Sequence, residues 1–150
     1  MVILALHPLF GVGIIIWMYK QYGYKKSRQE LRGEMAKKAR TSHEHSGLQI
    51  YRFALASTIL GIFINARIGY FAGEGIIGLF PSGLHGWFGI LGIVLLTFTI
   101  NKGKLVKKQR QERVSFALNL KRHSRSSDII MILIVFHAFL GFIYLFKLIV

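Results

Sequence analysis

Apolar and polar positions are sorted into long alternating blocks along this chain rather than mixed within each element. The apolar blocks cover Val2–Tyr19, Leu48–Phe71, Pro81–Ile100 and Ile129–Val150. Each block is close to the ~20 residues that a helix needs to cross ~30 Å of hydrocarbon. The pattern predicts an all-α integral membrane protein, a four-helix up-down bundle that forms a single transmembrane domain over residues 1–150. The predicted helices cover about 2–19, 45–71, 82–101 and 126–149.

Charge supports the membrane assignment and predicts an orientation. The chain is 53% hydrophobic, has no cysteine and carries a formal net charge of +14. A soluble domain that binds nucleic acid would spread its basic residues among amphipathic elements, so their segregation excludes that class. Of 20 Lys and Arg residues, eight lie within 20–44 and nine within 101–127. The positive-inside rule places these two loops in the cytoplasm, or in the stroma of a thylakoid, and both termini on the opposite side.

The polar connections carry further expectations. Residues 27–40 have a helical composition without an apolar face, which predicts a separate surface helix. Glycine and lysine together at 101–104 predict the end of the third helix. Ser126, Ser127 and Asp128 are candidate caps for the fourth helix, with a start before His123 as the alternative. The basic loops are expected to attract anionic lipid. The first apolar block lacks a positive n-region and an evident cleavage site, so it is expected to be retained.

Histidines beside glycines are the candidate chemistry of the apolar blocks. His85 opens the third block, and Gly89 and Gly92 follow on the same helical face, leaving a trough that a flat cofactor or another helix could fill. The same spacing recurs at His7 with Gly11 and at His137 with Gly141. A histidine within a membrane span is a functional candidate because lipid offers it no partner.

Four histidines fall one to a helix at intervals of 38, 40 and 38 residues: His7, His45, His85 and His123. Since the chain reverses direction between helices, alternate members share a level. His7 and His85 then share an outer level, and His45 and His123 share an inner level at the basic side, where His43 competes with His45. Two levels with one histidine from each of two helices is the arrangement that two bis-histidine haem b groups require.

The haem propionates need counter-charges at the inner level. Arg52 is the first candidate there, because an arginine within a spanning helix either reaches the interface or holds an acidic group. Lys121, Arg122 and Arg125 are the other candidates.

His137 is the runner-up as an iron ligand. Counted from Asp128, it lies only ~14 Å above the inner boundary, whereas His85 lies ~26 Å above Lys102. Pairing His137 with His85 would need a tilt mismatch of ~12 Å, compared with ~6 Å for His7. His137 is therefore expected to be a core or supporting histidine.

Several short motifs resemble known families. The arrangement of histidines resembles the ascorbate-reducible transmembrane di-haem cytochromes b, in which the first and third core helices hold one haem and the second and fourth hold the other. More closely, the chain resembles an uncharacterised four-helix membrane family of cyanobacteria and plastids. The motifs are Leu6-His7-Pro8, a basic segment reaching His45, residues 83–87 (GLHGW), and His123 after a basic loop. The resemblance implies a thylakoid or bacterial inner membrane.

Two classes of function remain open. The first is an electron-transfer cytochrome, rather than a conventional enzyme, with an unknown electron donor and acceptor. The second is a pigment-binding or scaffold subunit of a photosynthetic complex, in which single histidines ligate chlorophyll. Paired histidines favour haem. A transporter is a weaker alternative because no acidic residue lies deep in an apolar block.

Overall fold

The computed structural model describes residues 2–81 and 83–149, in which four long α-helices and one short 3-10 helix account for nearly the whole chain. The elements are α1 (Val2–Ser27), α2 (Gly33–Phe71), η1 (Gly75–Leu79), α3 (Leu84–Gln111) and α4 (Ala117–Ile149). These residues contain no strand, so the all-α prediction is confirmed. The predicted start of the third helix at residue 82 lies outside the described residues.

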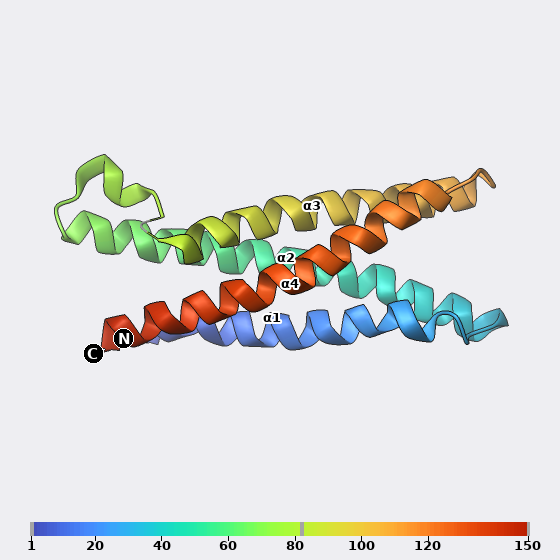
Figure 1. Ribbon diagram of the computed structural model, residues 1–150, viewed down its shortest axis with the longest axis horizontal. Coiled ribbons are helices and arrows are strands. Elements are labelled where there is room, and N and C mark those ends of the chain that lie inside the picture. Colours follow the sequence, from blue (N-terminus) through green and yellow to red (C-terminus); the bar gives the residue numbers. More distant parts are fainter. Residues whose placement is uncertain (1, 82, 150) are drawn as a thin grey trace.

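The four helices form a closed ring of neighbours. Helices α1 and α3 each pack against both α2 and α4, whereas the diagonal pairs make no close backbone contact among the described residues. Figure 1 shows the N- and C-termini at one end of the molecule, together with the connection that contains η1. The two basic connections lie at the other end. Any group in the interior is therefore reached from four helices at once.

Three helices of the described chain are long and apolar enough to cross a membrane: α2, α3 and α4 up to Lys147. Only 11%, 11% and 6% of their most apolar windows are buried inside the protein. The outward faces are instead covered with large exposed side chains such as Phe63, Val94 and Phe139. Apolar surface on this scale requires lipid or a partner as its solvent. A span in α1, which carries the first apolar block, remains a prediction.

The basic ends of the helices are longer than predicted. Residues 27–40 do not form a separate surface helix, because α2 runs without a break from Gly33 to Phe71. Lys, Arg, Glu and Ala are good helix formers, so the helix continues through them without an apolar face. Helix α3 likewise continues past the predicted stop at 101–104 to Gln111. Gly103 is not a cap, and the His123 ring packs against it: a Cβ there would lie 3.3 Å from His123 Cε1.

The connection between α2 and α3 is held against the end of α2. A Cβ built on Gly69 would lie 2.5 Å from the Cα of Gly78, so only glycine lets η1 approach α2 this closely. The Asn65 side-chain amide donates to the Phe80 carbonyl at 2.8 Å. These contacts fix the chain just before α3 begins and therefore fix the position of His85 along the long axis of the bundle.

Hydrogen bonds between helices set a constant antiparallel register. On α4, His123 and His137 are fourteen residues apart, as are their bonding partners Thr99 and His85 on α3. On α1, His7 and Gln21 are also fourteen apart, and so are their partners Ser57 and His43 on α2. The two hairpins, α1–α2 and α3–α4, are thus built on the same plan.

Candidate functional site

One local unit recurs five times between the paired helices. A side-chain nitrogen on one helix bonds to the carbonyl of residue i on its neighbour, and the side chain packs against the glycine at i+4. His85, for example, bonds through Nδ1 to the His137 carbonyl at 3.0 Å, and its ring lies on Gly141. A helical side chain covers the turn before its own Cα, so glycine at i+4 uncovers the carbonyl at i. The carbonyl–glycine pairs are Ser57–Gly61, His43–Gly47, His137–Gly141, His85–Gly89 and Thr99–Gly103.

This unit fixes the protonation of each neutral histidine that takes part in it. A carbonyl oxygen can only accept a hydrogen bond, so the Nδ1 of His7, His85, His123 and His137 carries the proton. The Nε2 of each neutral ring is then left with a free lone pair. Metal-binding histidines are oriented in this way, through the ring nitrogen that does not bind the metal.

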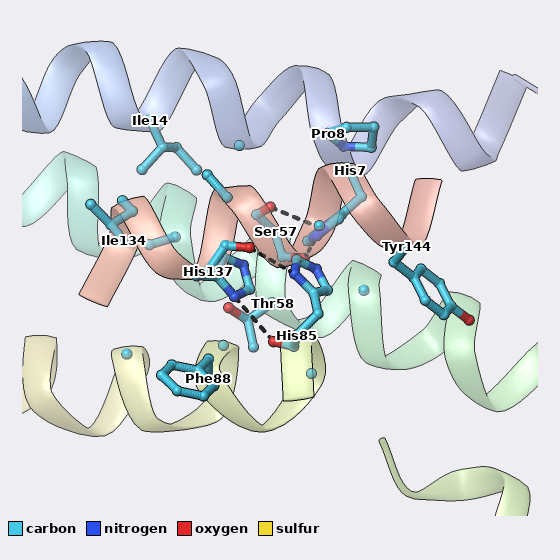
Figure 2. Close-up of a pocket in the computed structure, with 18 of the residues that line it drawn as sticks. His7, Pro8, Ile14, Ser57, Thr58, His85, Phe88, Ile134, His137 and Tyr144 are labelled. Carbon is cyan, nitrogen blue, oxygen red and sulfur yellow. Dashed lines mark hydrogen bonds between the residues drawn. The ribbon is translucent and has the colours of Figure 1, made fainter. Parts of the chain in front are cut away.

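Three of these rings form the outer cluster, His7, His85 and His137, at the end that holds the termini. One potential ligand atom from each lies within 4.8 Å of the other two. The His85 and His137 rings stack at 4.0 Å between centroids, and His7 meets His85 edge-on at 5.8 Å. Figure 2 shows the three rings converging from α1, α3 and α4. They line a cavity of about 290 Å³.

The inner cluster, His43 and His123, lies at the basic end and lines a second cavity of about 390 Å³. The two rings are nearly perpendicular, with centroids 6.1 Å apart. His123 Nδ1 donates to the Thr99 carbonyl at 2.9 Å, whereas His43 Nδ1 is buried with no hydrogen-bond partner among the described residues. The Tyr24 ring stacks on His43 at 4.3 Å. Ile50, Leu96 and other apolar core residues pack between the two clusters.

The predicted mismatch between His137 and His85 is wrong, because their rings are in contact. The error arose because Asp128 was assumed to lie at the inner membrane boundary. In the observed register Asp128 lies level with Val94, eight residues or about 12 Å above Lys102, and not level with Lys102 itself. Helix α4 begins at Ala117, so Asp128 is inside the helix and Ser126 and Ser127 are not its caps.

The predicted inner pair of His45 and His123 is not the pair that the structure brings together. His43 meets His123, while His45 is exposed and does not line the cavity. Because α2 is continuous, His43 shares a helical face with Ile50 and Ser57, both buried and both at seven-residue spacing. His45 instead shares its outward face with Arg52, which is also exposed.

Basic side chains do line the inner cavity, although they are not the predicted ones. Lys121, Arg122 and Arg125 are exposed and do not line it. Six other cations do: Lys25, Arg28, Arg40, Lys104, Lys107 and Arg110. Three of these six form ion pairs, Lys25 with Asp128 at 2.7 Å, and Lys107 and Arg110 with Glu44 at 2.9 and 3.5 Å. Arg28, Arg40 and Lys104 have no carboxylate partner among the described residues and are available to an anion.

An internal repeat explains the shared plan of the hairpins and was missed in the sequence. His7, Phe10, Gly11 and Ile15 match His85, Phe88, Gly89 and Ile93 at the same spacing. His43, Ile50 and Gly61 likewise match His123, Ile130 and Gly141. Aligning the two halves would have selected His43 over His45. It would also have identified Gln21 and Ser57, which correspond to Thr99 and His137, as residues at site positions.

No protein-family model, curated protein or solved structure matches this chain. Its function is therefore inferred from the two clusters themselves.

Proposed function

We propose that this protein is an integral-membrane b-type cytochrome that carries single electrons through an up-down bundle of four spanning helices. The exposed apolar faces of α2, α3 and α4 support insertion in lipid, and α1 completes the ring around the interior. The two basic connections share one end, so the positive-inside rule orients that end toward the side of insertion.

The inner pair is the observation that carries this proposal. A metal lies about 2.0 Å from an imidazole nitrogen, so two histidines on opposite sides of one iron have ring centroids about 6 Å apart. His43 and His123 lie at 6.1 Å and come from the diagonal helices α2 and α4. The buried Nδ1 of His43, which has no partner among the described residues, also needs one, and an iron atom would supply it.

The surroundings of the inner pair also fit a haem. The cavity walls are largely apolar toward the core, as a porphyrin requires, while Arg28, Arg40 and Lys104 can pair with its carboxylates. When bound, the haem supplies the one-electron chemistry. The protein holds the ligand rings: Thr99 orients His123, and Tyr24 holds His43 by stacking. Chlorophyll, the alternative cofactor, needs only one imidazole per pigment and leaves the pairing of the rings unexplained.

The test is haem binding by the purified protein, with ligand variants and a matched control. The oxidised and reduced absorption spectra should show a low-spin, bis-histidine b haem, and extraction should return about one haem per chain from the inner site. His43→Ala and His123→Ala should each abolish the low-spin signal of that haem, whereas His45→Ala, two residues away and exposed, should leave it unchanged. A chlorophyll spectrum, or haem retained in the His43→Ala/His123→Ala double variant, would contradict the proposal.

A further inference from the structure

The outer cluster has one histidine more than a bis-histidine haem uses. The His7 and His85 rings have nearly the geometry of the inner pair, with centroids 5.8 Å apart and an interplanar angle of 82°. Their helices, α1 and α3, are also diagonal. His137 is the difference, because its ligand atom lies within 4.8 Å of those of both other histidines.

His137 occupies the space that a second haem would need. A haem between His7 and His85 would place its macrocycle midway between two nitrogens about 4 Å apart. Any atom within 4.8 Å of both nitrogens lies closer to that plane than the ~3.5 Å of van der Waals contact. His137 is also held in place, since its Nδ1 donates to the His85 carbonyl at 3.1 Å and its ring lies on Gly89.

One nitrogen of each of the same three rings lies within 4.8 Å of the others, and a rotation of the stacked His85 and His137 rings would aim both in-plane lone pairs at a single ion. Each donates through Nδ1 to a backbone carbonyl, His7 to Ser57 at 3.0 Å, and His85 and His137 to each other at 3.0 and 3.1 Å. All three neutral rings therefore offer Nε2 as a lone-pair donor. Histidines that bind a metal almost always donate such a hydrogen bond from the ring nitrogen that does not contact the metal. Imidazole donors favour zinc, copper, iron and nickel over calcium and magnesium.

We propose that the outer cluster binds one divalent transition-metal ion, such as Zn²⁺ or Cu²⁺, through His7, His85 and His137. Three histidine ligands leave a fourth coordination position, which opens into the 290 Å³ cavity and can accept water or a small anion. The cluster contains no carboxylate, so an anion at the fourth position would offset part of the charge of the ion. This ion site goes beyond the proposed haem at the inner cluster and does not depend on it.

The experiment measures metal and haem in the same purified protein. After exhaustive dialysis against a chelator, titration with Zn²⁺ should load about one ion per chain, and Cu²⁺ should bind more tightly. His7→Ala and His137→Ala should each weaken Zn²⁺ binding at least tenfold, and His45→Ala should not change it. Bound Cu²⁺ should show nitrogen coupling in its electron paramagnetic resonance spectrum.

The inner haem serves as the control for folding in these variants. A His137→Ala protein that keeps the inner haem spectrum is folded, so its loss of Zn²⁺ reports on the outer site. Two haems per wild-type chain, or Zn²⁺ affinity unchanged in both variants, would overturn the ion site. Absence of haem together with one Zn²⁺ per chain would instead overturn the proposed cytochrome function and leave the ion site standing.

Discussion

The outer and inner clusters each contain a similar pair of histidines, and they differ in the third side chain that packs beside the pair. Both pair two nearly perpendicular histidines from diagonal helices, at 5.8 and 6.1 Å. In the outer cluster His137 adds a third imidazole. At the inner cluster the third position is occupied by Gln21, which bonds to the His43 carbonyl at 2.7 Å and packs on Gly47. His137 bonds to the His85 carbonyl and packs on Gly89 in the same way. If the proposed haem and ion are correct, the third side chain, and not the pair, decides which cofactor fits.

Replacing Gln21 by histidine should change the inner cluster more than any other substitution considered. An imidazole that donates to the His43 carbonyl over Gly47 would bring a third nitrogen to the inner cavity. We expect the Gln21→His protein to lose the inner haem almost completely and to bind about two Zn²⁺ ions per chain. Haem extraction and metal analysis of one sample measure both changes. Gln21→Asn, which cannot supply a ligand nitrogen, is the control, and haem retained at the wild-type level in Gln21→His would refute the role of the third side chain.

The reverse change should convert the outer cluster. Ser57 occupies in the first hairpin the position that His137 occupies in the second, so His137→Ser restores the symmetry of the two halves. With the obstruction removed, we expect His7 and His85 to take up a second haem, raising the content from about one to about two per chain. The ion site should be lost at the same time. Reduced-minus-oxidised spectra and haem extraction measure the gain. A content that stays at one, in a protein that no longer binds Zn²⁺, would show that His137 is not what excludes the haem.

Substitutions of the glycines beneath the rings should have a smaller effect. A Cβ on Gly141 would lie 2.7 Å from His85 Cε1, and one on Gly103 would lie 3.3 Å from His123 Cε1. We expect Gly141→Ala to destabilise the protein by about 1–3 kcal/mol and to weaken Zn²⁺ binding, because the ring must move off its carbonyl. Gly103→Ala should cost less, since a shift of a few tenths of an ångström relieves the contact.

Thermal unfolding and Zn²⁺ titration of the Gly141→Ala and Gly103→Ala proteins test the expected order of their effects. Gly11→Ala is the control, because a Cβ there meets nothing within 4 Å. It corresponds in the repeat to Gly89, the glycine under His137, and it is open because Ser57 stands where a ring would be. Equal effects at positions 141 and 11 would show that the ring contact does not matter.

The helices and the histidine levels were predictable to different degrees. Blocks of apolar residues report directly on helices, so each of the four predicted segments overlaps one observed helix. The basic ends of the helices were not placed correctly, because Lys, Arg and Glu form helix equally well inside and outside an apolar environment. The error of eight residues at Asp128 followed from this, since a boundary defined by charge was taken as a height. His7 and His85 were correctly placed at one level, although α1 and α3 both continue past the assumed boundaries, because those boundaries, Lys20 and Lys102, differ in height by only about 6 Å.

The choice between neighbouring histidines depended on the face of the helix and not on its ends. His43 and His45 differ by about 200° around α2, so only one can face the interior. The seven-residue spacing between His43 and Ile50 contained that information, as did the match of His43 with His123 in the repeat. Contacts across helices, such as Gly103 beneath His123, could not be deduced without the register, which a single sequence does not state.

The internal repeat has a consequence for the number of ligands. Two identical hairpins related by a twofold axis would present every side chain twice, so a centre on that axis could only have an even set of ligands. Three histidines around one centre require two hairpins that differ, as these do at Ser57 and His137. Two halves within one chain can diverge in this way, and the proposed ion would then have an odd number of protein ligands and an open fourth position in a molecule that is otherwise close to symmetric.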